Sequence, residues 1–267
     1  MTTPFDLYLF STDAKLVAAA VQAGLTGAVV DWEYVGKERR QASADTQINR
    51  DSPEDLQRLR AFTRARLLCR INAFGPGTAE EVEQAAGAGA DEILLPMVQR
   101  ADEVLRLLDI VRGRLGVGIL IETRAAVAQA AELGALPLTR VYFGLNDFAI
   151  ETGAANIFRA VADGTVEQVR SKVVVPFGFA GVTLPDRGSP IPCRLLIGEM
   201  MRIGSGFSFL RRSFMADCRG GGVGDAVLRI SEALGRARLR APGQVEADHA
   251  ELLERIGSAA PAGCRRS

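Results

Sequence analysis

Short apolar runs alternate with amphipathic stretches along most of the chain. The apolar runs are typical of buried strands, which we expect at residues 5–10, 27–32, 66–72, 92–96, 117–122, 141–145, 177–184 and 207–211. Helical patterns follow them, at about 13–24, from 53, from 78, 101–112, 123–133, 157–172, 192–203 and 225–238. Strands that alternate with helices predict βαβ units and a parallel sheet.

Eight strands and eight helices predict a closed (β/α)8 TIM barrel rather than an open, doubly wound sheet. No GxGxxG or GxxxxGK[S/T] pattern occurs, so the phosphate loop of a nucleotide-binding fold is missing. We expect one catalytic barrel domain over residues 1–240. A short C-terminal helix and a flexible tail should occupy residues 241–267.

The composition narrows the classes of partner. Of 267 residues, 48% are hydrophobic and 32 basic residues balance 32 acidic ones, so the chain lacks the basic surface of a nucleic-acid binder. No apolar run reaches the ~18 residues that span a bilayer, and the first residues do not resemble a signal peptide. We therefore expect a cytoplasmic protein without nucleic-acid or membrane partners. Four scattered cysteines (Cys69, Cys193, Cys218 and Cys264) predict free thiols, with Cys69 on a strand.

The single histidine, His249, excludes sites built on two histidines and disfavours Ser-His-Asp or Cys-His chemistry. It lies in a charged pattern typical of a terminal helix. We expect it to face solvent.

Two carboxylates follow consecutive predicted strands. Glu122 comes after Gly118–Ile121 and Asp147 after Val141–Leu145, so both should reach the rim where barrel active sites lie. Mg²⁺ binds through one or two carboxylates together with substrate oxygens and water. The pair therefore predicts a metal site, although each acid could instead cap the following helix.

Polar side chains also follow the other strands. The candidates are Asp31, Glu33 and Tyr34 after the second strand, Arg70 and Asn72 after the third, Pro96 after the fourth, Gly144 and Asn146 after the sixth, and Arg211 and Arg212 after the eighth. Arg211 and Arg212 either bind a distal phosphate or carboxylate or are solvated.

Five ordered stretches carry a family resemblance. They are residues 29–33 (VVDWE), 69–72 (CRIN), 93–98 (ILLPMV), 120–123 (LIET) and 143–148 (FGLNDF), closed by Gly153. With these motifs the chain resembles the HpcH/HpaI aldolase and citrate lyase beta-subunit family over roughly residues 5–155. The last third of the chain matches no family motif.

The resemblance implies Mg²⁺ or Mn²⁺ on Glu122 and Asp147 and a substrate-binding arginine at Arg70. It further implies cleavage or formation of a carbon–carbon bond next to a carbonyl, through an enolate. A metal that chelates a 2-oxo acid acts as a Lewis acid on the carbonyl, and a guanidinium can bind the carboxylate or enolate oxygen. We expect Asp31 and Glu33 to orient Arg70, unless all three merely form a rim ion pair. The substrate-binding set is Arg70, Asn72, Pro96, Gly144 and Asn146.

One position departs from the family. The pyruvate aldolase branch has a histidine for proton transfer where this chain has Tyr34, and the citrate lyase branch has an aspartate there. Tyr34, Glu33 or a metal-bound water could transfer the proton. A tyrosine with an ordinary pKa near ~10 is a poor base at neutral pH but a workable acid.

The sequence therefore predicts a divalent-metal-dependent lyase or aldolase for a hydroxy or oxo acid, or for its acyl thioester. Alternatives are an acyl-CoA thioesterase on the same metal site and a non-catalytic, ligand-binding paralogue. The resemblance also implies a homo-oligomer, a trimer or hexamer.

Overall fold

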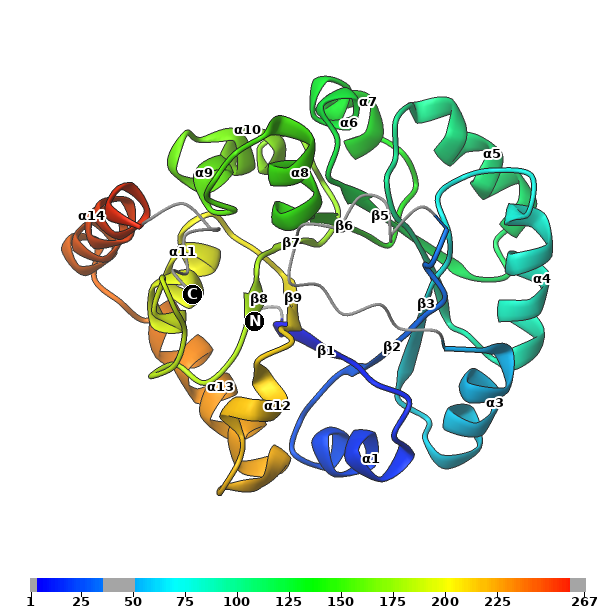
Figure 1. Cartoon of the computed structure of the whole chain (residues 1–267), viewed down its shortest axis with the longest axis horizontal. Helices are drawn as coiled ribbons and strands as arrows, with labels where there is room; N and C mark the ends of the chain where they lie inside the picture. Colours follow the sequence, from blue (N-terminus) through cyan, green and yellow to red (C-terminus); the bar gives the residue numbers. More distant parts are fainter. Residues whose placement is uncertain (1–3, 36–50, 260–267) are drawn as a thin grey trace, which may run out of the picture.

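The chain folds into a barrel of parallel strands surrounded by helices (Figure 1). The computed structural model describes residues 4–35 and 51–259. The strands are β1 Asp6–Phe10, β2 Gly27–Asp31, β3 Arg66–Arg70, β4 Glu92–Leu95, β5 Gly116–Ile121, β6 Arg140–Phe143, β7 Phe177–Phe179, β8 Gly181–Val182 and β9 Phe207–Leu210. They are ordered β7-β6-β5-β4-β3-β2-β1-β9-β8, and every pairing is parallel.

The predicted seventh strand is interrupted at one residue. Ala180 separates β7 from β8 and has a φ of 49°, a left-handed conformation that stops the ladder. The Ser208 hydroxyl donates a hydrogen bond of 2.5 Å to the Ala180 carbonyl and holds this kink against β9. Because β7 pairs with β6 and β8 with β9, the two pieces together close the ring almost completely, and the predicted (β/α)8 barrel is confirmed.

Helices cover the outside of the ring. Within the described residues they are α1 Ala14–Gln22, α3 Pro53–Phe62, α4 Thr78–Ala88, α5 Ala101–Val111, α6 Arg124–Ala128, α7 Ala130–Gly134, α8 Leu145–Thr152, α9 Arg159–Ala162, α10 Thr165–Arg170, α11 Cys193–Arg202, α12 Phe214–Asp217, α13 Gly222–Arg238 and α14 Pro242–Ser258. The start of α3 follows the expected local signals: Ser52 caps it in a capping box with Asp55, and Pro53 occupies the first turn.

One helix prediction and one strand prediction were wrong in detail. The helix expected at 157–172 is two short helices, α9 and α10, because Gly164 adopts a φ of 81° between them. The strand expected at 141–145 ends at Phe143, and α8 begins immediately after Gly144. Asn146 and Asp147 therefore lie in the first turn of a helix rather than at the end of a strand.

Inward and outward strand positions build two separate apolar layers. Outward side chains pack against the helices in the larger core, as the strand residue Cys69 does. Inward side chains fill the barrel with a smaller cluster of Tyr8, Val29, Leu68, Leu94, Leu120, Phe207 and Phe209. At the amino end of the barrel, buried Arg140 donates hydrogen bonds of 2.6 and 3.0 Å to Glu92 and stacks on Tyr8. The carboxyl ends of the strands form the opposite rim.

The C-terminal helix α14 packs on α11 at the edge of the molecule (Figure 1). Its His249 does not simply face solvent as expected. The side chain is 30% exposed, and Nδ1 lies 2.9 Å from the carboxylate of buried Glu199 on α11. The tertiary contact between two helices far apart in the sequence decides this environment. The division into residues 1–240 and 241–267 stays a prediction, and residues 260–267 of the tail lie outside the described residues.

The described cysteines Cys69, Cys193 and Cys218 are free and buried, and Cys264 lies outside the described residues. Within residues 4–35 and 51–259, no helix is long and apolar enough to cross a bilayer.

Candidate active site at the carboxyl rim of the barrel

The candidate site residues come from neighbouring strand ends. Asp31 is the last residue of β2 and pairs in register with Arg70, the last residue of β3. Glu122 directly follows β5, and Asp147 lies in the first turn of α8, just beyond β6. Parallel pairing from β2 to β6 brings these four side chains to the same rim of the barrel.

Two acids fix the orientation of Arg70. Its Nε and one terminal nitrogen donate to the two carboxylate oxygens of Asp31, at 2.9 and 2.7 Å. The other terminal nitrogen is 3.3 Å from the Glu33 carboxylate, and the guanidinium lies over the Phe10 ring at 5.0 Å. Burial alone would lower the pKa of Arg70, but Asp31 and Glu33 raise it by more. Arg70 therefore remains a positioned cation.

Glu122 is a buried carboxylate, 2% exposed. Its Oε1 accepts a hydrogen bond of 2.8 Å from the Met97 N–H. Burial, followed by the charges of Asp147 and Glu33, raises the pKa of Glu122 to about 8, although the Met97 N–H and Arg70 act in the opposite direction. The surroundings of Glu122 hold too little positive charge to stabilise its ionised carboxylate. A bound divalent cation would supply that charge.

The backbone around Glu122 is shaped to receive its side chain. A Cβ on Gly144 would lie 2.8 Å from the Glu122 Cβ and closer still to its carboxylate, so a larger residue there would displace Glu122. Met97, whose N–H binds Glu122, has a φ of 55°, a left-handed conformation that costs a non-glycine residue ~1–3 kcal/mol. The surrounding structure therefore stabilises the left-handed conformation of Met97 at the residue whose N–H binds Glu122.

Thr123 links Glu122 to the next loop. Its hydroxyl accepts a hydrogen bond of 3.0 Å from Ala126 N–H, which caps α6, and donates one of 2.6 Å to the Val98 carbonyl. The loops after β4 and β5 are therefore tied together beside the carboxylate.

The donor set fits a hard divalent cation. Within the described residues no group of three or more His, Cys, Asp or Glu side chains is arranged to hold a metal. Glu122 and Asp147 are close enough for the charge of Asp147 to raise the pKa of Glu122. If these two carboxylates bound a cation, the remaining coordination positions would be open to substrate and water, which is how Mg²⁺ is commonly bound.

Asn72 braces the loop after β2. Its side-chain oxygen accepts hydrogen bonds from the N–H groups of Tyr34 and Val35, at 3.0 and 2.8 Å, and its nitrogen donates to Glu81. Asn72 thereby holds the segment that carries Glu33. The Tyr34 side chain is 58% exposed. The catalytic role of Tyr34 and the substrate contact of Asn72 stay predictions.

The other predicted substrate-binding residues occupy the same rim. Pro96 is buried directly after β4, Gly144 is the N-cap of α8, and Asn146 is half-buried in the first turn of that helix. Their contacts with a substrate also stay predictions.

Arg211 is engaged within the protein. Its Nε donates a hydrogen bond of 2.9 Å to the Ser213 hydroxyl, which in turn donates to Asp217. Thr183 donates a second hydrogen bond to the same oxygen of Asp217, at 2.6 Å. This network fixes α12 beside the end of β9. Anion binding by Arg211 and Arg212 stays a prediction.

An aromatic floor that sequence analysis missed lies beneath the site. We use this term for the inward-facing rings of Phe10, Tyr142 and Phe209. The Phe209 ring centroid is 5.2 Å from that of Phe10 and 4.6 Å from that of Tyr142. Aromatic residues at the last or next-to-last position of three strands could have indicated it, because alternate strand residues face the barrel axis.

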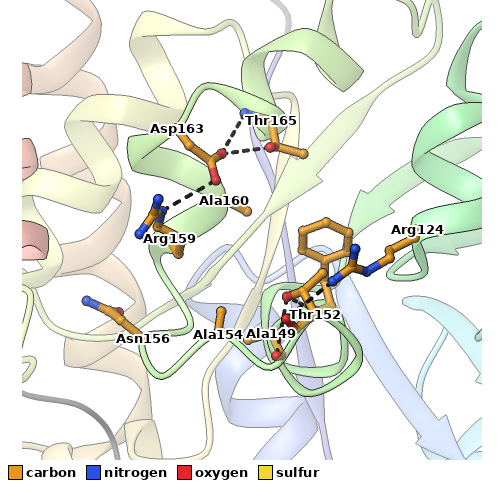
Figure 2. A pocket seen from close by; sticks show the side chains of 10 residues that line it. Arg124, Ala149, Thr152, Ala154, Asn156, Arg159, Ala160, Asp163 and Thr165 are labelled. Atoms are coloured by element: carbon orange, nitrogen blue, oxygen red, sulfur yellow. Dashed lines mark hydrogen bonds and ion pairs between the residues drawn. The ribbon is translucent and has the colours of Figure 1, made fainter.

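A separate hollow of about 390 Å³ lies outside the barrel, between α8 and the α9–α10 segment. Figure 2 shows Arg124 and Arg159 at opposite sides of this hollow. Their polar groups are already engaged: Arg124 donates to the Thr152 carbonyl, and Arg159 lies 3.7 Å from Asp163, which accepts from Thr165. The catalytic candidates Arg70, Glu122 and Asp147 do not line it.

Comparison with known proteins identifies the family. The model of the HpcH/HpaI aldolase/citrate lyase family matches residues 5–175. The chain belongs to this family. Its membership makes it an enzyme of the aldolase or lyase type, and the matched region contains the whole rim from Asp31 to Asp147.

A solved structure has the same fold. The crystal structure of RipC from Yersinia pestis superimposes with a TM-score of 0.55 at 14% sequence identity, covering 90% of this chain and 98% of RipC. At this identity the likeness concerns the fold alone. No curated protein sequence matches the chain.

Proposed function

We propose that this HpcH/HpaI family member is a divalent-metal-dependent carbon–carbon lyase or aldolase for a hydroxy or oxo acid, or its acyl thioester. The observation that carries the proposal is the buried carboxylate of Glu122. Burial and the neighbouring charge of Asp147 raise its pKa, and Arg70 provides a cation on the same rim. A buried carboxylate next to a second carboxylate destabilises the ligand-free protein. A bound cation would neutralise this negative charge, and Arg70 would attract an anionic substrate.

Glu122 and Asp147 would hold Mg²⁺ or Mn²⁺, which, when bound, polarises the substrate carbonyl. Arg70 would bind the substrate carboxylate or the oxygen that becomes negative as the enolate forms. Its fixed orientation matters because preorganised charges need not move during reaction. Asp31 and Glu33 act as positioning residues for Arg70 through the ion pairs described above.

The proton-transfer group is best sought at Glu33. Its carboxylate is buried and lies 3.3 Å from Arg70, whereas the Tyr34 ring is largely exposed. A metal-bound water remains the alternative to a protein group.

The direct test is deuterium exchange into the methyl group of pyruvate, followed by NMR with Mg²⁺ and after metal removal. We expect metal-dependent exchange that Glu122→Gln and Asp147→Asn reduce by about 100-fold or more, a loss typical of removing an electrostatic element of an active site. Glu151→Gln is the matched control, because it removes a carboxylate from the same helix as Asp147.

In the same assay Glu33→Gln should slow exchange more than Tyr34→Phe while metal binding persists.

Full metal-dependent turnover in both metal-site variants would disprove the proposal. If pyruvate does not exchange, the same measurement on an acetyl thioester tests the thioester branch. Recovery of one intact acid with free thiol would instead indicate a thioesterase, and metal binding without exchange on either donor would indicate a ligand-binding role.

A further inference from the structure

Tyr142 is placed to act in the candidate site. It lies on β6, in register with Leu120 on β5, two residues before Glu122. Its ring faces the barrel axis, with its centroid 4.6 Å from that of Phe209 and 5.9 Å from that of Phe207. The amino end of the barrel is filled by Tyr8, Arg140 and Phe207, so the half-buried Tyr142 is reached from the carboxyl rim.

The Tyr142 hydroxyl makes no hydrogen bond with any residue in the described part of the chain, and only burial and charge influence its pKa. Tyr8 provides a contrast inside the same barrel. It is fully buried at the other end, and its hydroxyl donates to Asp6 at 3.4 Å. Tyrosine hydroxyls inside a protein usually find a hydrogen-bond partner, so a hydroxyl without one among the described residues is available to a ligand.

Tyr142 lies close enough to the charged residues of the candidate site for them to influence its pKa. Burial, together with the charge of Glu122, raises the pKa of Tyr142 above its ordinary value, and Arg70 opposes the shift. A neutral tyrosine hydroxyl is a hydrogen-bond donor as well as an acceptor, so Tyr142 can donate to a substrate oxygen. A neutral donor in a site of low polarity stabilises negative charge without adding a charge of its own.

We propose that Tyr142 is a further catalytic residue, whose hydroxyl donates a hydrogen bond to the substrate oxygen that gains negative charge beside Glu122 and Arg70. This inference rests on the proposed function. The Phe207 and Phe209 rings pack against the Tyr142 ring, so the donor is positioned before substrate binds. Replacement by phenylalanine removes the donor and keeps the ring contacts.

The test measures binding of oxalate, a planar analogue of a pyruvate enolate, to Tyr142→Phe in the presence of Mg²⁺. We expect the oxalate Kd to rise about 10- to 100-fold, as for a lost hydrogen bond to a charged group, and the Mg²⁺ Kd to stay within about twofold. Tyr8→Phe is the matched control, since it removes a hydroxyl from the opposite end of the barrel. It should bind oxalate like the wild type.

A second measurement uses the unsubstituted site. The chain has three tyrosines, so 3-fluorotyrosine labelling gives three ¹⁹F resonances, and Tyr8→Phe and Tyr34→Phe assign the third to Tyr142. Oxalate with Mg²⁺ should shift the Tyr142 resonance and leave that of Tyr8 in place.

An unchanged oxalate Kd in Tyr142→Phe, or a Tyr142 resonance that does not move when oxalate binds, would overturn this inference and leave the proposed function intact. A wild-type protein that does not bind oxalate with Mg²⁺ would instead contradict the oxo-acid branch of the proposed function and this inference with it.

Discussion

Gly144 is the residue on which the position of the carboxylate pair depends most directly. It lies between β6 and α8, and the Glu122 side chain occupies the space that a Cβ would need. Its φ of −83° is open to any residue, so the requirement for glycine is steric contact and not backbone conformation. The role of Gly144 is therefore to admit Glu122, whatever contact it makes with substrate.

We expect Gly144→Ala to weaken Mg²⁺ or Mn²⁺ binding about 10- to 100-fold, the range found when groups that orient metal ligands are changed. Isothermal titration calorimetry or Mn²⁺ electron paramagnetic resonance measures the affinity. Gly77→Ala is a close control, because Gly77 also precedes a helix, at a φ of −82°, and a Cβ there meets nothing within 4 Å. An unchanged metal Kd in Gly144→Ala would show that Glu122 does not need this space.

At the scale of elements, α14 packs mainly on α11 and also contacts α9. Leu252 and Ile256 are its buried apolar residues, and Arg194 on α11 donates to Glu251 at 2.6 Å. The contact between His249 and Glu199 adds a polar interaction between α14 and α11. The apolar contacts should dominate the docking energy, because the Arg194–Glu251 ion pair is partly exposed and such pairs contribute little.

We expect Leu252→Ala to destabilise the docked helix by about 2–4 kcal/mol, the usual cost of truncating a fully buried leucine. Hydrogen exchange should accelerate in the α14 amides and remain unchanged in β1–β6. Leu239→Ala is the control, since Leu239 is 87% exposed at the end of α13. Equal acceleration across the barrel strands would show that α14 unfolds only with the whole domain.

At the scale of the whole molecule, the candidate site couples stability to pH. In the metal-free protein the pKa of Glu122 is about 8, above its ordinary value of 4.5. Between these two values the folded state keeps a proton that the unfolded chain has lost. A rise in pH therefore favours unfolding across this window, and bound metal should reverse the effect because it requires the carboxylate.

We expect the free energy of unfolding of the metal-free wild type, relative to that of Glu122→Gln, to fall as pH rises from about 5 to about 8. The slope should approach at most about 1.4 kcal/mol per pH unit. Urea unfolding of both proteins at matched pH values measures the difference, and Glu122→Gln should be the more stable of the two at pH 8 without metal. Parallel pH profiles would indicate that Glu122 ionises as it does in the unfolded chain.

The sequence by itself determined the barrel, because hydrophobic periodicity and local capping signals act over a few residues and recur with each βα unit. It also placed Asp31, Arg70 and Glu122 at strand ends, where a parallel sheet brings them together, and its ordered motifs indicated the family that the comparison confirmed.

Only the tertiary structure decided the features that depend on distant contacts. The break at Ala180 requires β9 as a partner, and the pairing of His249 with Glu199 requires α14 to dock on α11. The proximity of Tyr142 to Glu122 and Arg70 arises because strands separated in sequence face one axis. Local sequence patterns specify which way a side chain faces, whereas closure of the strands into a barrel determines which other side chains it contacts.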